Sequence, residues 1–156
     1  MKPKWWNKSR SYLIKKDKVI SKLIRSYKGH LTTRNNFFYS LTRSIISQQI
    51  SVAAADSVFS KFEKKCKNKI NPKTVQKLSI QDLKKCGLSK MKAIGIKSLA
   101  QKILDKSFNP KLIKKMTDEE AIIYLSSLRQ IGRWSAEMIL IFFYNRPNIW
   151  PVQDIG

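Results

Sequence analysis

Several residue types are scarce in this chain of 156 residues, and each shortage excludes a class of protein. The only 2 cysteines, Cys66 and Cys86, form neither a CxxC pair nor a metal-binding spacing. With His30 as the 1 histidine, we expect no zinc site. We also expect no disulfide framework, and this cysteine usage favours a reducing, cytosolic setting.

Long apolar segments are also missing. No run approaches the roughly 18 consecutive apolar residues that a membrane-spanning helix needs. The N-terminal segment "MKPKWWNKSR" lacks the apolar stretch of a secretory signal peptide. The sequence therefore predicts neither a membrane span nor a secretory leader.

Acidic residues are few. The chain has 10 of them against 32 lysines and arginines, which gives a formal net charge of +22. Nucleic acid is the leading candidate for the missing counter-charge, because binding to a duplex releases its condensed cations. The alternative is a lysine-rich composition that serves only solubility. An anionic membrane surface is disfavoured, because the basic residues are spread along the chain and not gathered on one amphipathic segment.

Glycine and proline number 5 each, and strand-like alternation is absent. Apolar residues recur at helical spacing through most of the chain. The pattern predicts an all-α fold in one domain over residues 1–156, with room for two small helical lobes and a DNA cleft between them. The expected helices lie within residues 17–28, 35–49, 51–65, 71–78, 79–87, 90–106, 117–128 and 133–145.

The closing segment predicts a helical hairpin over about residues 125–145. Leu125 and Leu128 end a first helix, and Gly132 is expected to permit a tight turn that a side chain would block. A second helix begins near Arg133–Ser135, and its first N–H groups have no partner within the helix. A DNA phosphate can bind those N–H groups without any base being read. The alternative is an ordinary turn between two helices.

Four motifs in order carry a resemblance to a known family. They are "FFYSLTRSIISQQISVAAADSVFSKF", "GLSKMKAIGIKSLA", "LRQIGRWSAEM" and "RPNIWPVQDIG". Together they resemble the helix-hairpin-helix DNA glycosylase superfamily, and most closely its 3-methyladenine DNA glycosylase II, or alkylpurine, branch. The resemblance covers about Asp17 to Gly156 and implies a monofunctional DNA glycosylase of base excision repair.

The chain departs from the family pattern in two places. Gln130 stands where the pattern has the first glycine of the hairpin. The chain also ends two residues after Asp154, whereas further helices follow in the family. We therefore expect a C-terminally truncated or reduced version of the fold.

The resemblance implies a set of DNA contacts and a base pocket. In the family a side chain from the turn after the QQIS helix fills the gap left by the flipped base, and Gln49 matches it with Gln48 beside it. Two polar residues that simply end a helix are the alternative reading. The hairpin contacts are expected from Gln130, Gly132, Arg133 and Ser135. Trp134 and Met138 are the expected pocket residues, with weaker candidates at Trp5, Trp6, Phe37, Phe38 and Trp150.

Asp154 is the expected catalytic residue. Cleavage of a glycosidic bond passes through an oxocarbenium-like transition state, and a carboxylate beside it stabilises the positive charge and can activate water. Its Asp-Ile-Gly context is also that of a helix start, and a helix N-cap is the alternative role. No second catalytic acid is evident, which suits a leaving base that is already cationic, such as 3-methyladenine.

Two features of the bifunctional relatives are missing. Their catalytic lysine stands at the position of Trp134, so we expect no Schiff base and no lyase step. Their iron–sulfur cluster needs four cysteines, so we expect no cluster and no metal held by side chains. A structural Na⁺ or K⁺ on backbone carbonyls of the hairpin is the one cofactor we consider.

We therefore predict a monomer that binds double-stranded DNA containing alkylated bases, in the cytoplasm and associated with the nucleoid. A non-catalytic helix-hairpin-helix module or inactive glycosylase fragment is the main alternative. An RNA-binding, ribosome-associated protein would also explain the charge, but not the ordered motifs.

Overall fold

Capping side chains fix where most of the helices begin. In the computed structural model, which describes residues 2–154, these side chains each accept a hydrogen bond from a backbone N–H in the first helical turn. Such bonds satisfy N–H groups that have no partner within the helix. The capping residues are Asp17, Asn36, Ser51, Asn71, Ser79, Ser89 and Thr117.

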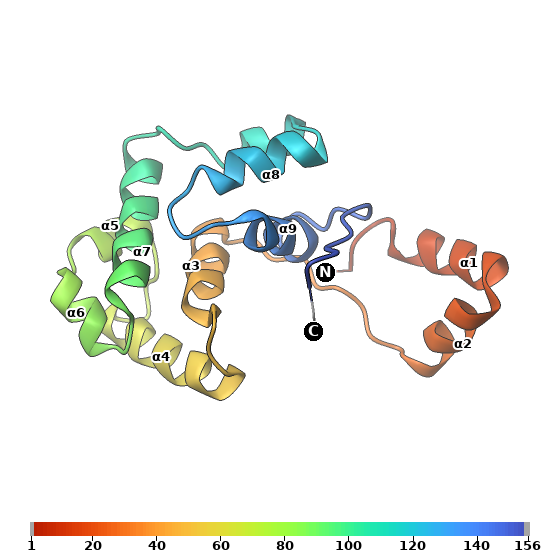
Figure 1. Cartoon of the computed structure of the whole chain (residues 1–156), viewed down its shortest axis with the longest axis horizontal. Coiled ribbons are helices and arrows are strands. Elements are labelled where there is room, and N and C mark those ends of the chain that lie inside the picture. Colours follow the sequence, from red (N-terminus) through yellow and green to blue (C-terminus); the bar gives the residue numbers. More distant parts are fainter. Residues whose placement is uncertain (1, 155–156) are drawn as a thin grey trace.

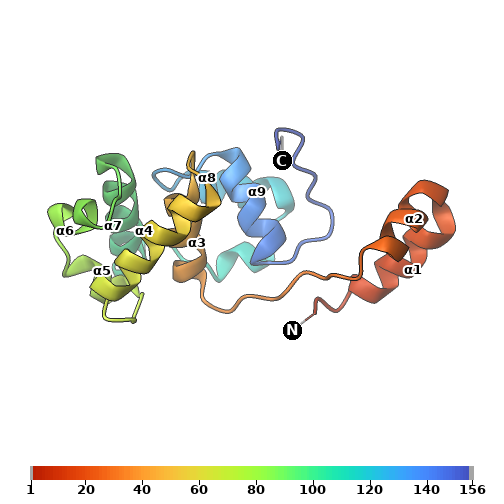
Figure 2. The same cartoon turned by 90° about the horizontal axis from the view of Figure 1, so that it is seen from below.

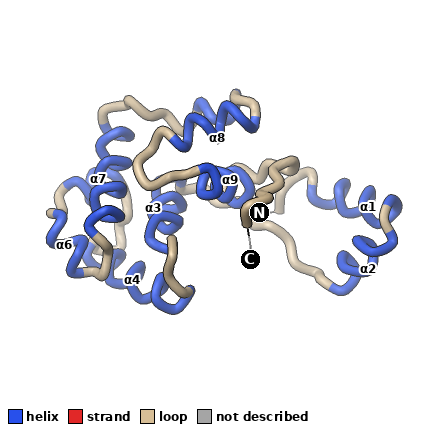
Figure 3. Tube along the Cα trace, viewed as in Figure 1, coloured by secondary structure: helices blue, strands red, loops and turns tan. Residues whose placement is uncertain are grey.

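The described residues contain helices and loops but no strand (Figure 3). The predicted all-α fold is therefore confirmed, and each predicted helical segment contains a helix. The elements are α1 (Trp6–Lys16), α2 (Lys18–Ser26), α3 (Phe37–Ser47), α4 (Val52–Lys65), α5 (Pro72–Gln76), α6 (Ile80–Lys85), α7 (Lys90–Leu104), the 3-10 helix η1 (Leu112–Lys115), α8 (Asp118–Ser126) and α9 (Arg133–Phe142).

The first helix, α1, was not predicted from the sequence. It buries none of its residues and has its main helix contact with α2, so the two form a hairpin that stands apart from the other helices (Figures 1 and 2). Much of the apolar face of α2 is consequently exposed, with Val19 at 68%, Leu23 at 53% and Tyr27 at 72%. The indole N–H of Trp5 donates to the Asn145 carbonyl at 2.7 Å and ties this hairpin to the rest of the chain.

The core lies among α3 and the helices that follow it. Helix α3 contributes Leu41 and Ile45, and α4, α7 and α9 pack around it. Both cysteines lie in this core, and burial raises the pKa of the Cys66 thiol to about 11. They therefore behave as small apolar residues. Within residues 2–154, no helix is long and apolar enough to cross a membrane.

Candidate functional site

The loop between α8 and α9 has its left-handed residue at Gln130 and not at the glycine. Gln130 has φ 69°, whereas Gly132 has φ −91° and ψ −180°, an extended conformation that any residue adopts. A Cβ added at Gly132 would meet nothing within 4 Å. Our expectation that a side chain at Gly132 would block the turn was therefore wrong. The absence of a side chain there leaves open space in front of the first N–H groups of α9.

Gln130 occupies the position where the family pattern has glycine, and the structure shows how it is accommodated. A glutamine with positive φ is strained by about 1–2 kcal/mol relative to glycine. Its side chain lies against Gly95 of α7, where an added Cβ would come within 2.7 Å of the Gln130 Cγ. Glycine inside a helix normally lowers the stability of that helix. At the buried position 95, however, glycine makes room for the side chain of Gln130.

Gln48 joins the end of α3 to the hairpin. Its Nε2 donates to the Gln130 carbonyl at 2.7 Å and to the Ser135 hydroxyl at 3.1 Å. Ser135 is buried, so its hydroxyl faces the protein interior. The amide nitrogen of Gln48 and the hydroxyl of Ser135 thus bind each other in this structure, and DNA contacts from the Gln48 and Ser135 side chains stay predictions. Contact through the Ser135 N–H stays a prediction.

Gln49 differs from its neighbour. It is exposed, has φ 55° and lies in the turn between α3 and α4, just before the capping Ser51. An exposed amide on a tight turn suits a side chain that enters a duplex. Its role as a wedge stays a prediction.

Arg133 is held by two carboxylates. Its guanidinium donates to both Glu119 oxygens at 2.7 and 2.8 Å and to the Glu137 Oε1 at 3.1 Å. These hydrogen bonds lower the pKa of Glu119, and Glu137 is buried. Arg133 therefore braces the start of α9 against α8. Any phosphate contact by its side chain would compete with these ion pairs.

One face of α9 lines a cavity of about 300 Å³. Trp134 and Met138, both predicted as pocket residues, lie here together with Phe142, one further helical turn along. The opposite wall comes from α3, and Arg34 and Arg43 complete the lining. Phe142 and the arginines were missed from the sequence, although the i, i+4, i+8 spacing of Trp134, Met138 and Phe142 indicates a shared face.

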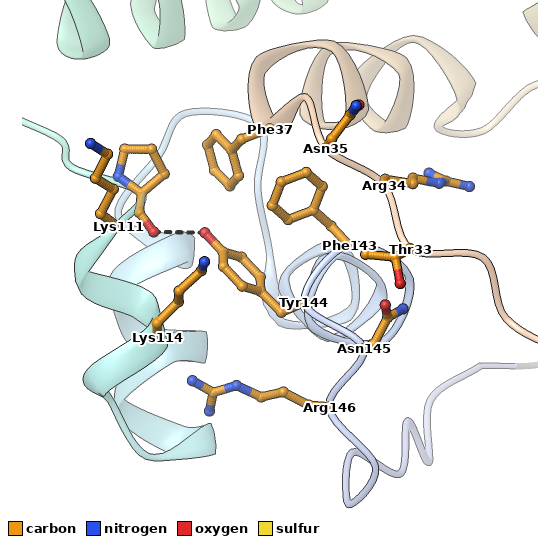
Figure 4. A pocket seen from close by; sticks show the side chains of 11 residues that line it. Thr33, Arg34, Asn35, Phe37, Lys111, Lys114, Phe143, Tyr144, Asn145 and Arg146 are labelled. Carbon is orange, nitrogen blue, oxygen red and sulfur yellow. Dashed lines mark hydrogen bonds between the residues drawn. The ribbon is translucent and has the colours of Figure 1, made fainter. Parts of the chain in front are cut away.

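A larger cavity of about 710 Å³ lies beside it, and Arg34 lines both. Figure 4 shows the rings of Phe37, Phe143 and Tyr144 gathered between the η1 segment and the start of α3. The Tyr144 hydroxyl donates to the Pro110 carbonyl at 2.7 Å, and burial raises the pKa of this phenol. Lys111 and Lys114 lie on one side of the rings, so the cavity combines an aromatic floor with cationic walls.

The remaining candidates lie elsewhere. Asp154 is exposed on the turn that follows Pro151, and its N–H donates to the Pro151 carbonyl at 3.0 Å. It lines neither of the two cavities, and the helix we expected to start at Asp154 falls outside the described residues. Trp150 is 83% exposed, and Phe38 is buried in the core. Trp5 and Trp6 line a separate apolar cavity between α1 and α2.

No group of three or more potential metal-binding side chains occurs within the described part of the chain. The Gln130 carbonyl accepts a hydrogen bond from Gln48, which leaves one of its lone pairs for another partner. A monovalent cation on the hairpin carbonyls stays a prediction.

Comparison with known proteins assigns the fold to a family. The sequence matches the family described as "HhH-GPD superfamily base excision DNA repair protein" over residues 42–156. It is 34% identical over 121 residues to the alkylbase DNA glycosidase-like protein mag2 of Schizosaccharomyces pombe, covering 75% of this chain and 57% of that protein. It is 29% identical over 143 residues to DNA-3-methyladenine glycosylase 1 of the same yeast, covering 89% and 63%. The chain thus spans less than two thirds of the length of these relatives.

Solved structures agree on the fold. The S. pombe 3-methyladenine DNA glycosylase in complex with abasic DNA superimposes with a TM-score of 0.77 at 27% identity, covering 95% of this chain and 75% of that one. An 8-oxoguanine glycosylase/lyase from Clostridium acetobutylicum gives a TM-score of 0.79 at 19% identity, covering 95% and 54%. The second likeness shows the shared fold alone.

The contact between Gly95 and Gln130 predicts whether replacing Gly95 raises or lowers the stability of the fold. Alanine normally stabilises a helix relative to glycine by about 1 kcal/mol. Here Gly95→Ala would place a Cβ 2.7 Å from the Gln130 Cγ, so we expect it to destabilise the fold by about 1–3 kcal/mol. Urea unfolding measures the change.

The double variant Gly95→Ala/Gln130→Gly is the control. It removes both the clash and the left-handed glutamine, so it should be more stable than Gly95→Ala alone. If the effects of the two substitutions on the free energy of unfolding were additive, the contact with Gln130 would not be the reason that alanine is unfavourable at position 95.

Proposed function

The chain belongs to the HhH-GPD superfamily of base excision DNA repair proteins, and we propose that it is a monofunctional DNA glycosylase that releases alkylated purines such as 3-methyladenine from duplex DNA. One observation carries the proposal. A cavity lined by Trp134 and Met138 opens on the first turns of α9, directly beyond a hairpin whose N–H groups can bind phosphate. The names of the relatives support the same chemistry.

DNA binding begins at the hairpin. Gly132 is the N-cap residue of α9, and no side chain accepts a hydrogen bond from the first turn of this helix. The positive end of the α9 dipole lies at the N–H groups of that turn. A backbone phosphate bound there needs no base-specific contact. The net charge of +22 supplies long-range attraction, so binding is non-specific in sequence and sensitive to salt.

The cavity between α9 and α3 receives the flipped base. The face of Trp134 attracts a cationic alkylpurine. Arg43 does not oppose that cation fully, because it pairs with Asp56 and stacks on Phe59 at 4.7 Å from the ring centroid. Arg34 lines both cavities and is placed to bind the phosphate that accompanies the flipped nucleotide.

Asp154 supplies the carboxylate in this proposal. When the chain closes on a flipped nucleotide, its negative charge stabilises the developing oxocarbenium ion and orients the attacking water. A cationic base departs without a protonating acid. This agrees with the pairing of Glu137, the buried acid among the described residues, with Arg133.

Among the described residues, no lysine lines the cavity of Trp134 and Met138. Trp134 stands where the bifunctional members of the family carry their lysine. Lys92 lines an adjoining pocket with Trp134, but its amine donates to the carbonyls of Ile46 and Gln48. This amine would have to leave both carbonyls before it could attack a sugar. We therefore propose hydrolysis with no lyase step and with no iron–sulfur cluster.

A non-catalytic DNA-binding module is the second candidate. The observation in its favour is that Asp154 lies on an exposed turn and lines neither cavity. It predicts DNA binding without release of any base from methylated DNA, so one assay of the parent chain separates the two. Monomeric state and a nucleoid location remain predictions under either candidate.

Substitution of Gly132 tests the phosphate site. Gly132→Val places its Cβ in space that is empty within the protein, but valine is a poorer N-cap than glycine, so stability should fall by about 1 kcal/mol. The side chain would block an approaching phosphate, and duplex affinity should fall by about tenfold, with one fewer counterion in the salt dependence. Fluorescence anisotropy over a salt series measures both.

The matched control is Gly29→Val, because a Cβ at Gly29 also meets nothing within 4 Å. It should bind DNA like the parent. Parental affinity in the Gly132 variant would remove the hairpin from the interface.

Asp154→Asn tests the catalytic carboxylate. The substitution keeps the shape and removes the charge, so excision of 3-methyladenine should slow by at least about a hundredfold. Duplex binding should be as tight or tighter, because an anion near the phosphates is gone. Single-turnover base release and anisotropy give the two values.

Asp105→Asn, at an exposed site at the end of α7, makes the same change in net charge. It controls for the general effect of charge on DNA binding and should excise like the parent. Excision by the Asp154 variant at the parental rate would show that another group supplies the catalysis.

Borohydride trapping tests the absence of a lyase step. The parent, incubated with damaged duplex and sodium borohydride, should form no covalent adduct, because no amine replaces Trp134. A bifunctional glycosylase/lyase run in parallel verifies the reagent. A trapped band from the parent would overturn the monofunctional assignment.

A further inference from the structure

Lys92 caps the C-terminal end of α3. Its Nζ donates to the Ile46 carbonyl at 2.8 Å and to the Gln48 carbonyl at 2.7 Å. The last carbonyls of a helix have no partner within the helix, so a lysine from another element can satisfy them. Lys92 is half-buried, and burial lowers its pKa from the ordinary value. The lysine is therefore tied to the backbone and does not extend into solvent.

Gln48 continues this chain of contacts toward the hairpin. Its carbonyl accepts from Lys92, and its amide nitrogen donates to the Gln130 carbonyl and the Ser135 hydroxyl. One residue is thus held from two sides, by α7 and by the loop that precedes α9. Gln130 in turn contacts Gly95, which is also on α7, so α7, Gln48 and the loop before α9 each contact the other two.

Gln49 follows directly. It is exposed at φ 55°, and the Ser51 cap that begins the next helix lies two residues further on. Because Gln48 is fixed on both sides, the turn that carries Gln49 has a fixed spacing from the hairpin. A misplacement of about 1 Å in a positioned group can reduce a rate about a hundredfold, so such a spacing matters.

We propose that Lys92 and Gln48 are positioning residues that hold the Gln49 turn in register with the phosphate-binding hairpin, so that Gln49 enters the duplex as the base leaves it. This inference rests on the proposed glycosylase function. Neither residue touches the DNA in this account. Lys92 holds the turn, Gln48 links it to the hairpin, and Gln49 fills the gap.

The chain offers a matched control for Lys92. Lys97 lies on the same helix and makes the same kind of cap, donating to the Gln76 carbonyl at 3.0 Å and the Leu78 carbonyl at 2.6 Å. It caps α5, which is remote in sequence from both Gln49 and the hairpin, and is likewise half-buried. Lys92→Met and Lys97→Met therefore remove equivalent contacts from two different places.

The experiment compares excision of 3-methyladenine from duplex and from single-stranded methylated DNA. Extrusion of a base costs a few kcal/mol in a duplex and little in a single strand, so a displaced wedge should affect only the duplex. Lys92→Met and Gln48→Glu should lose about tenfold or more on duplex and stay near the parent on single strands. Gln49→Ala should show the same pattern, and Lys92→Arg should recover much of the loss because it can still donate to both carbonyls.

Lys97→Met should lower the melting temperature about as much as Lys92→Met and leave the duplex-to-single-strand ratio at the parental value. Equal ratios for the two methionine variants, or equal losses on both substrates, would reduce Lys92 to a purely structural role and overturn the proposal. Failure of the proposed function is a separate result, since the parent would then release no base from either substrate.

Discussion

A shortage of negative charge constrains this molecule throughout. With 32 basic and 10 acidic residues, the positive charges of the chain repel one another. Several of the acidic side chains form ion pairs that hold helices together. Asp82 caps α6 and pairs with Lys65, which keeps the pKa of that carboxyl well below its usual range. Glu119 and Glu137 brace Arg133, and Asp118 pairs with Arg146. The surplus cations are left for an external polyanion.

The contacts that organise the candidate site are mostly neutral or backbone-directed. The side-chain amine of Lys92 donates to two backbone carbonyls, and Gln48 links α3 to the hairpin through its side-chain amide. Part-buried hydrogen bonds of this kind are little affected by salt, whereas the attraction between surface lysines and DNA is screened within about 8 Å at physiological ionic strength. The hydrogen bonds that set the geometry of the site are thus different interactions from the charge attractions that bring DNA to it.

Local signals made the helical fold predictable. The Thr117–Glu120 capping box, the Ser51 and Ser79 caps and the apolar face of α9 all act within one or two turns, so they can be recognised in the sequence without knowledge of the tertiary structure. Helix α1 was missed because its residues bury nothing and so leave no clear apolar period. Trp134 and Met138, which the family resemblance implied as pocket residues, line one cavity.

The site's internal connections could not be predicted, because they join residues distant in the chain. The amide of Gln48 meets partners 82 and 87 residues away, and nothing in the local sequence distinguishes it from Gln49. The role of Gly132 was misjudged for a related reason. Its sequence context suggests a turn that needs glycine, but the backbone puts the positive φ at Gln130, where Gly95 of another helix makes it tolerable.

The positive field also bears on the substrate that we propose. A cationic alkylpurine entering a cavity with Arg34 and Arg43 on its wall is opposed by the protein's own charge. DNA brings the phosphates that neutralise this field, and Asp56 already compensates Arg43. The cavity is therefore favourable to a cationic base only while the duplex is bound. Cleavage of the glycosidic bond leaves its electron pair on the base and the positive charge on the sugar, so the released base is neutral and the field opposes the substrate but not the product.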